Sequence, residues 1–295
     1  MAFYVGNNGS INVGVEATYG TAPTSGYDTL FGISSSLGLK RTLIEPAHLS
    51  INPVASNDYV PLFVDGEITC NWSEEADVMD ELLKSFFTGG TSLPYTMTGG
   101  PANASITAVT AHSSSLGYVH TGLVATSFGL EIGTNEYPVV TMGFIGEGSA
   151  KDTTPIHSTP SISSIAPPTV YSSVSIGGTS IGVKSASVNC ERQYSGGDRA
   201  ILGGTTLSQP VEIGKRSITA SLTVDLSDET AFNSVTEFDK YLSGTSLGTI
   251  IIGGGNSTIT LSNCRMTGDV PSLGDGLTEF PISVVSTGIS MAALA

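Results

Sequence analysis

Charged residues and long apolar runs are both scarce in this 295-residue sequence. Charged residues make up 13% of the chain, and no run approaches the roughly 18 apolar residues that a membrane-spanning helix needs. The first eight residues lack the basic region and apolar stretch of a secretory signal peptide. We therefore expect a protein that is made in a cytoplasm and makes no contact with a membrane.

Cysteine and histidine are also rare, and their positions exclude two kinds of site. The cysteines are odd in number and far apart, with no CxxC or Cys/His pairing, which argues against a disulfide framework or a zinc site. We expect Cys70, Cys190 and Cys264 to be small buried hydrophobic residues in a reducing compartment. The histidines stand singly, without metal-ligand spacing: His48, His112, His120 and His157.

Two motifs that carry catalysis or bind cofactors are missing. There is no Walker loop and no HExxH motif. Gly203-Gly204 and Gly253-Gly254-Gly255 lack the spacing and the strand-to-helix context of a phosphate loop, so turns explain them. Glu74-Glu75 and Asp228-Glu229 suggest an acid/base or metal pair, but both precede predicted helices, where the helix dipole favours anions. We predict no enzyme activity, cofactor or metal.

Basic residues are too few for a nucleic-acid-binding protein. The formal net charge is −15, of which −11 lies in residues 1–160 and −4 in the remainder. A duplex is held by lysine and arginine side chains that neutralise its phosphates. The chain should therefore repel DNA, although solubility alone also explains a net charge far from zero.

Glycine and apolar residues are plentiful. The 36 glycines, with serine and threonine at most boundaries, are typical of short strands joined by turns. With 39% hydrophobic residues the chain is too apolar to be disordered. Its length suits two domains of ordinary size or one unusually large β domain.

The sequence repeats a series of features at a separation of about 150 residues, a plausible domain length. Leu49–Asn52 leads into a loop that returns at Val60–Val64, as Ala186–Asn189 leads into a loop that returns at Gln209–Ile213. An alternating strand follows in each half, at Gly66–Ser73 and Arg216–Thr223. Such alternation predicts one packed face and one wet face. The predicted packed residues are Ile68, Cys70 and Trp72, then Ile218, Ala220, Leu222, Val224 and Leu226.

A helix and a closing strand complete each half. The first helix has an apolar face of Val78, Met79, Leu82, Leu83, Phe86 and Phe87. The second has a capping box at Ser234 and Glu237 and a stop at Gly244. The closing segments are Glu136–Val140 and Glu279–Ser283, each with a proline that favours an edge strand or a strand start.

We interpret this series as a duplicated domain in a mainly β chain. The predicted units are residues 1–150, a linker over 151–173 rich in proline, serine and threonine, and residues 174–295. Each unit is expected to be a β-sandwich or barrel with one flanking α-helix.

Several segments resemble tailed-bacteriophage major tail tube proteins. Glu16–Thr21 and Ser35–Arg41 are similar to the start of these proteins. The second half is similar as well, through a long loop with Leu202-Gly203-Gly204, the strand Ser217–Leu226, and the helix after it. The resemblance covers nearly the whole chain.

The resemblance implies a virion structural protein that self-assembles into stacked rings around a conduit for DNA ejection. Rings in this family contain six domains, so a duplicated chain would form a trimer with pseudo-sixfold symmetry. A hexamer would follow if the two halves form one large domain. The implied setting is the virion tail, assembled in the host bacterial cytoplasm. The implied partners are further copies and the tail terminator, tape-measure and distal tail proteins, with DNA passing through without specific binding.

Two sets of residues are candidates for these roles. The wet faces of the alternating strands should line the lumen, and two long loops, Pro53–Tyr59 and Gln193–Ser208, should contact the next ring unless they are ordinary surface loops. The lumen candidates are Glu67, Thr69, Asn71, Thr219, Ser221, Thr223 and Asp225. The loop candidates are Pro53, Asn57, Asp58, Tyr59, Tyr194, Asp198, Arg199 and Leu202.

Two other classes of function stay open at this point. A surface or secreted β-sandwich binding module explains the strands equally well, but it does not explain the missing signal peptide or the helix in each half. A hydrolase with an unrecognised site conflicts with the absence of convergent titratable groups.

Overall fold

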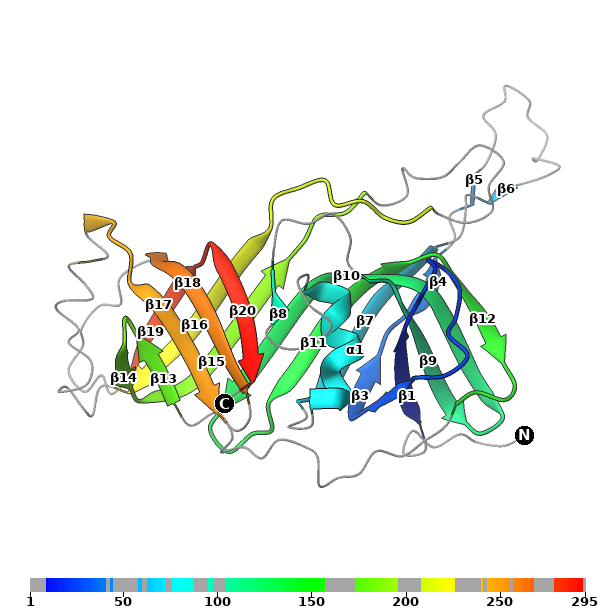
Figure 1. The fold of residues 1–295 in the computed structure, drawn as a ribbon, viewed down its shortest axis with the longest axis horizontal. Coiled ribbons are helices and arrows are strands. Elements are labelled where there is room, and N and C mark those ends of the chain that lie inside the picture. Colours follow the sequence, from blue (N-terminus) through cyan, green and yellow to red (C-terminus); the bar gives the residue numbers. More distant parts are fainter. Residues whose placement is uncertain are drawn as a thin grey trace, which may run out of the picture.

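The structure is a computed structural model of the chain. It describes residues 9–40, 43–44, 58–59, 63–72, 76–87, 95–97, 104–156, 173–195, 208–225, 240, 243–254, 257–267 and 279–293. As predicted, this part of the chain is mainly β (Figure 1).

A long antiparallel sheet, here called the central sheet, runs through both halves of the sequence. Each strand hydrogen-bonds to the next in the order given, and Figure 1 shows them from the blue N-terminal strands at the right to the orange and red ones at the left. The order is β3 (Gly32–Ser35) with β4 (Gly38–Lys40), β7 (Phe63–Asn71), β11 (Val139–Gly146), β10 (Leu116–Gly133), β15 (Val183–Glu191), β16 (Ser217–Asp225), β19 (Glu279–Val285) and β18 (Ser257–Thr267).

Two further sheets pack against the central one. The first outer sheet contains β2 (Asp28–Leu30), β1 (Ser10–Val15), β9 (Ile106–Ser113), the start of β10, and β12 (Gly148–Asp152). The second outer sheet contains β14 (Thr179–Ile181), β13 (Ser173–Ile176), β17 (Gly248–Gly254), the start of β18, β20 (Gly288–Ala293) and β8 (Tyr95–Thr96). A separate pair is formed by β5 (Leu43–Ile44) and β6 (Asp58–Tyr59).

β10 passes from the first outer sheet into the central sheet. Its N-terminal part pairs with β9 and β12, and its C-terminal part pairs with β11 and β15. The bend falls at Gly122, whose φ of 66° lies in the left-handed region that favours glycine. A Cβ at Gly122 would come within 2.8 Å of the Glu147 Cβ and 2.9 Å of the Tyr19 Cζ. A side chain is therefore excluded at this bend.

The first predicted helix is present as α1 (Ala76–Phe86), in front of the first half in Figure 1. Its buried residues Leu82, Phe86 and the following Phe87 belong to the hydrophobic core. The second predicted helix falls mostly outside the described residues, but its end is described. Gly244 has a φ of 66°, and the Thr245 N–H donates to the Lys240 carbonyl at 2.9 Å, which is the hydrogen bond of a glycine-terminated helix. The predicted stop at Gly244 is thus confirmed.

Alternation along β7 and β16 is confirmed by burial. Every predicted packed residue from Ile68 to Trp72 and from Ile218 to Val224 is buried, and all join one hydrophobic cluster with the outer sheets. The three cysteines are buried and free, as expected. Burial raises the pKa of the Cys70 and Cys190 thiols to about 12, so both stay protonated at neutral pH.

The described strands next to β16 and β7 come from segments that the predicted repeat does not align with each other. The neighbour of β16 is β15, which contains Ala186–Asn189, whereas the neighbours of β7 on that side are β3 and β4. Leu49–Asn52, which the comparison matched to Ala186–Asn189, lies outside the described residues. Among the described residues, 32–40 flank β7 as β15 flanks β16, because strand order depends on pairing and not on the distance to a loop.

The closing segments are offset as well. Tyr137 is 54% exposed, whereas Phe280, its counterpart in the sequence, is 5% exposed. Pro138 lies just before β11, but Pro281 lies within β19 and pairs with Thr223. A shift of register by one residue moves every side chain to the other face of a sheet, so a matching motif does not guarantee matching positions.

Candidate assembly interface

The predicted lumen residues of two distant strands lie on one face of the central sheet. On β7 they alternate with buried residues, and on β16 they do the same. We call this side, opposite the core, the polar face; its predicted members here are Glu67, Thr69, Asn71, Thr219, Ser221 and Thr223. Hydroxyl groups link neighbouring strands across it, with Thr69 Oγ1 3.2 Å from Thr141 Oγ1. The backbone of Asp225 ends β16, but its side chain lies outside the described ones.

Further carboxylates on the polar face were not predicted. Glu131 of β10, Glu191 of β15 and Glu279 of β19 are exposed. They lie outside the two strands for which the sequence predicted alternation. The period-two pattern of buried residues over 127–133 and 185–191 was the signal that could have placed two of them. Lys184 forms an exposed ion pair with Glu279 at 2.7 Å. The face therefore combines hydroxyl groups with acidic side chains.

The two halves of the chain meet in a continuous ladder, here called the internal seam. Residues 127–133 of β10 pair antiparallel with residues 185–191 of β15, with Gly129 opposite Asn189 and Leu130 opposite Val188. On the core side, Leu130, Val188 and Cys190 are buried. The central sheet thus crosses from one half to the other without an edge.

An aromatic cluster and an arginine stabilise the internal seam on its core side. The Phe128 ring of β10 contacts the Phe87 ring edge-on at 5.3 Å and lies 5.8 Å from the Phe86 ring. The Arg192 guanidinium, directly after β15, lies 4.7 Å from the centre of the Phe86 ring. Arg192 is buried, and its N–H donates to the Thr126 carbonyl at 2.8 Å. A residue of the second half therefore covers the helix of the first half through a desolvated cation–π contact.

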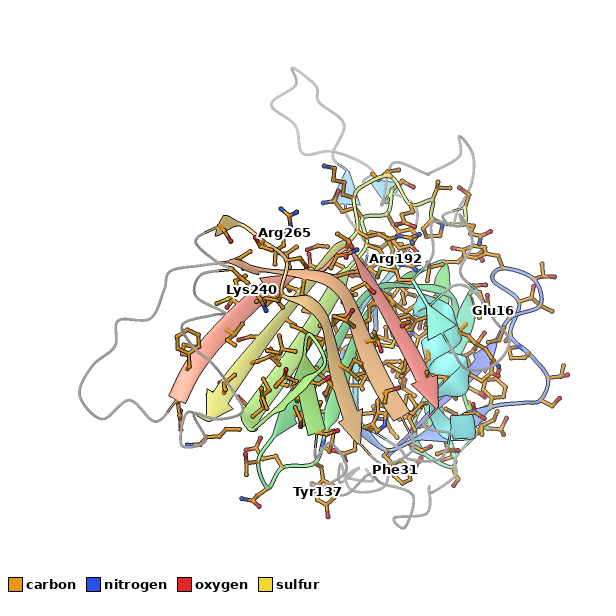
Figure 2. The ribbon with its side chains drawn as sticks, turned by 60° about the vertical axis from the view of Figure 1, so that its left-hand side comes forward. Glu16, Phe31, Tyr137, Arg192, Lys240 and Arg265 are labelled. Atoms are coloured by element: carbon orange, nitrogen blue, oxygen red, sulfur yellow. The ribbon has the colours of Figure 1, made fainter. Side chains whose placement is uncertain are left out.

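Both ends of the central sheet are open among the described residues. β3 pairs with β7 alone, and residues 265–267 of β18 pair with β19 alone. Figure 2 shows Arg265 in the upper part of the molecule and Phe31, which immediately precedes β3, near its lower edge. Unpaired N–H and C=O groups at such edges invite pairing with another chain.

Among the described residues, hairpin arms leave the central sheet at one end. β4 is followed by the β5–β6 pair, and beyond β15 the Ile213 N–H donates to the Gln193 carbonyl at 2.8 Å. Four antiparallel steps separate β7 from β16, so the two strands run in the same direction and both arms emerge together, at the top of Figure 1.

The predicted loop residues belong to these arms where they are described. Asp58 and Tyr59 form β6, and Tyr194 bridges to Glu212 at the base of the second arm. The others lie outside the described residues: Pro53, Asn57, Asp198, Arg199 and Leu202. Two apolar side chains of the second arm that were not predicted, Val211 and Ile213, are 45% and 69% exposed.

The opposite end of the sheet carries the turn between β10 and β11. Tyr137 in this turn projects from the lower edge of the molecule in Figure 2. A cavity of about 260 Å³ lies beside it, lined by Glu131, Glu136 and Ser187 among others. Arms and turn therefore lie at opposite ends of the same sheet.

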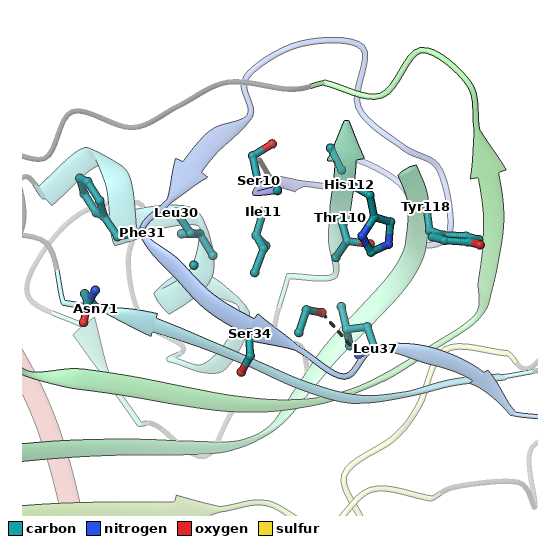
Figure 3. A pocket seen from close by; sticks show the side chains of 14 residues that line it. Ser10, Ile11, Leu30, Phe31, Ser34, Leu37, Asn71, Thr110, His112 and Tyr118 are labelled. Carbon is teal, nitrogen blue, oxygen red and sulfur yellow. Dashed lines mark hydrogen bonds between the residues drawn. The ribbon is translucent and has the colours of Figure 1, made fainter. Parts of the chain in front are cut away.

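A larger cavity of about 510 Å³ lies next to the open β3 edge, between β3 and the first outer sheet (Figure 3). Ile11 and Leu30 form its apolar floor, and Ser34, His112 and Tyr118 reach its rim. Its position makes it a surface that an adjoining chain can cover.

The Glu16 carboxylate of the early Glu16–Thr21 motif has a structural role. Glu16 is 6% exposed. Its Oε1 accepts from the Thr107 hydroxyl and the Gly122 N–H, both at 2.7 Å, and its Oε2 accepts from the Gly20 N–H at 2.8 Å. One carboxylate thereby joins the 16–21 turn, β9 and the bend of β10.

The pattern Gly-x-Ser-x-Gly occurs twice, at 178–182 and 244–248, and neither instance has the geometry of a nucleophile elbow. Ser180 lies in the exposed strand β14, paired with Ser175. The Ser246 hydroxyl donates to the Cys264 carbonyl at 3.0 Å and accepts from the Gly248 N–H. A nucleophile elbow needs a serine at a strand-to-helix turn. Both serines have structural roles instead.

In the part of the chain that the structure describes, no cluster of three or more histidine, cysteine, aspartate or glutamate side chains is arranged to hold a metal ion. No helix in that part is both long and apolar enough to cross a membrane.

A buried histidine makes the stability of the fold pH-dependent. His120 is 2% exposed; its Nε2 lies 3.2 Å from Thr110 Oγ1, and its Nδ1 has no hydrogen-bond partner among the described residues. Burial lowers the pKa of His120 to about 4. Since the unfolded chain takes up a proton near pH 6.5 and the folded chain near pH 4, stability is full above pH 6.5 and falls as the pH drops to 4. The loss should be about 3 kcal/mol.

Urea unfolding followed through the single tryptophan, Trp72, between pH 7 and pH 4 measures this loss. His120→Gln should flatten the decline, whereas His112→Gln, at an exposed histidine on the neighbouring strand β9, should leave it unchanged. An equally steep decline in His120→Gln would assign the effect to other groups.

The described part of the chain is therefore a mainly β protein with two open sheet edges, an acidic polar face and arms at one end. The sequence profile of the phage tail tube protein family matches residues 6–286, nearly the whole chain, so the chain belongs to that family. The predicted resemblance is confirmed. Comparison with curated proteins gives no match. Family membership implies a structural role in the phage tail and self-association into a tube.

Proposed function

We propose that copies of this chain close into rings, that the rings stack into the tail tube, and that the polar face of the central sheet lines the lumen through which DNA is ejected. The observation that carries this proposal is the continuity of the central sheet across both halves, with an open edge at each end. Joining such edges in a circle yields a closed β-lined cylinder, which removes the unpaired edges.

The chemistry of the polar face suits a conduit. Carboxylates such as Glu67, Glu131 and Glu191 repel the phosphates of DNA, and the neutral hydroxyl groups carry no charge that attracts them. DNA therefore passes without specific binding. In this proposal, part of the negative charge of the chain lies on the lumen wall.

Stacking is assigned to the arms. Both arms project from one end of the sheet, and the Tyr137 turn with its cavity lies at the other. A head-to-tail contact between unlike ends repeats without limit, as a tube requires. The terminal rings would be closed by the tail terminator, tape-measure and distal tail proteins.

We infer that residues 1–150 and 174–295 are tandem repeats joined by the linker 151–173. The order β3, β7, β11, β10 in one half and β15, β16, β19, β18 in the other supports this inference. The units are not independent, because β8 of the first half pairs with β20 of the second. Three chains would then supply the six repeats of a ring.

Cryo-electron microscopy of the purified protein tests the proposal. We expect stacked rings with a regular axial repeat, and a projection down the axis distinguishes three chains from six. A protein that stays monomeric at high concentration in every condition would refute the tube.

A paired variant tests the arms separately. Val211→Ser with Ile213→Ser should leave rings intact but shorten tubes several-fold, since it removes exposed apolar surface from the arm. Ile251→Ser, at a 37% exposed position on the second outer sheet, is the matched control and should give tubes of normal length. Unaltered tubes in the double variant would exclude this part of the arm from stacking.

A further inference from the structure

The central sheet contains a row of residues that runs from one open edge to the other. Each residue pairs with the next, and the row crosses the internal seam between Gly129 and Asn189. Its members in order are Ser34, Thr69, Thr141, Gly129, Asn189, Thr219, Val285 and Arg265. Ser34 and Arg265 end the row, and both are exposed.

The two halves of the row have the same arrangement. Ser34 on β3 occupies the place that Asn189 has on β15, one strand before the alternating strands β7 and β16. Arg265 on β18 occupies the place that Gly129 has on β10, one strand beyond β11 and β19. The direction also agrees, since β18 runs parallel to β10 and β3 runs parallel to β15, each pair being separated by an even number of antiparallel steps.

We propose that the ring-closing junction repeats the internal seam, with β18 of one copy paired antiparallel to β3 of the next and Arg265 opposite Ser34. This junction rests on the proposed function and adds the strands and the register. It fills the unpaired backbone groups of both edges with hydrogen bonds of the kind already made between β10 and β15.

The side chains on both faces suit this register. On the core side, Met266 follows Arg265 as Leu130 follows Gly129, and it is partly buried against the core. In the next copy it would reach the mouth of the 510 Å³ cavity beside β3, where a flexible thioether chain fills irregular space well. On the polar face, Arg265 would approach the edge strand β3, and Glu67 on the adjoining strand β7 supplies complementary charge.

Cysteine cross-linking tests the register. The double variant Ser34→Cys with Arg265→Cys, assembled and treated with a short thiol cross-linker, should give covalent oligomers that end at the size of one ring. A mixture of the two single variants, each checked for rings by electron microscopy, should give covalent dimers and nothing larger. The native cysteines are fully buried, so the wild type is the background control.

Two further pairs set the limits of the test. Ser34→Cys with Ser221→Cys, an exposed position in the middle of the sheet, should remain unlinked. Gly129→Cys with Asn189→Cys should link within one chain and produce no oligomers. Rings that form without a Ser34–Arg265 cross-link overturn the junction but leave the tube function standing. A chain that forms no rings would overturn both the proposed junction and the proposed tube function.

Discussion

Replacing Glu16 with alanine is expected to lower the free energy of unfolding by about 4 kcal/mol. The carboxylate is buried and accepts hydrogen bonds from the Thr107 hydroxyl and from the N–H groups of Gly20 and Gly122. Each donor that loses its partner in a buried place costs about 1–3 kcal/mol. The bend of β10 at Gly122 would lose its anchor, and with it the passage of this strand into the central sheet.

Chemical denaturation of Glu16→Ala, Glu16→Gln and Glu136→Ala at concentrations that keep the chain monomeric measures this effect. Glutamine offers a single acceptor oxygen and a competing donor, so its loss should be intermediate. Glu136 is an exposed carboxylate in the β10–β11 turn, and its removal should cost within about 0.5 kcal/mol. If Glu16→Ala were as stable as Glu136→Ala, the carboxylate would have no structural role.

Replacing Phe128 with alanine should cost about 3–5 kcal/mol, the usual range for a buried aromatic residue. Phe128 is fully buried at the internal seam, where its ring contacts Phe86 and Phe87 of the helix region and its backbone pairs with Cys190. The cavity left behind would also loosen the face of Phe86 that Arg192 covers. The same variant should therefore weaken the coupling between the two halves.

Phe31→Ala is the matched comparison. Phe31 is buried as well, but it lines the existing 510 Å³ cavity, so less packing is lost and the cost should be smaller. Differential scanning calorimetry should show one transition for the wild type and a broadened or split transition for Phe128→Ala. A single sharp transition at an unchanged temperature in Phe128→Ala would show that the aromatic cluster does not couple the halves.

Local patterns in the sequence predicted the parts of the fold that local chemistry controls. Alternation over 66–73 and 216–224 placed the buried and polar faces of β7 and β16, because successive side chains of a strand point to opposite sides. Apolar spacing placed α1, and Gly244 marked a helix end because glycine adopts the left-handed conformation without strain.

Pairing between distant strands could not be predicted in the same way. The match of Leu49–Asn52 to Ala186–Asn189 did not identify the described neighbours of β7, which are β3 and β4 and are separated from β7 in the sequence by a long arm. The match of Glu136–Val140 to Glu279–Ser283 is out of register. Hairpin turns and bulges shift strand pairing by single residues, and a short sequence motif does not show such a shift.

The sequence alone determined that this chain is a mainly β, acidic member of the phage tail tube protein family, without a Walker loop or an HExxH motif. Composition is a property of the sequence itself, and alternation depends on residues close together along the chain. Both can therefore be recognised without a structure. The tertiary structure decided that both halves share one central sheet, that its open edges are β3 and β18, and that the arms leave from one end. These features depend on pairing between segments far apart in the chain, such as residues 127–133 with 185–191 and residues 64–71 with 139–146, and packing selects those partners only when the whole core forms.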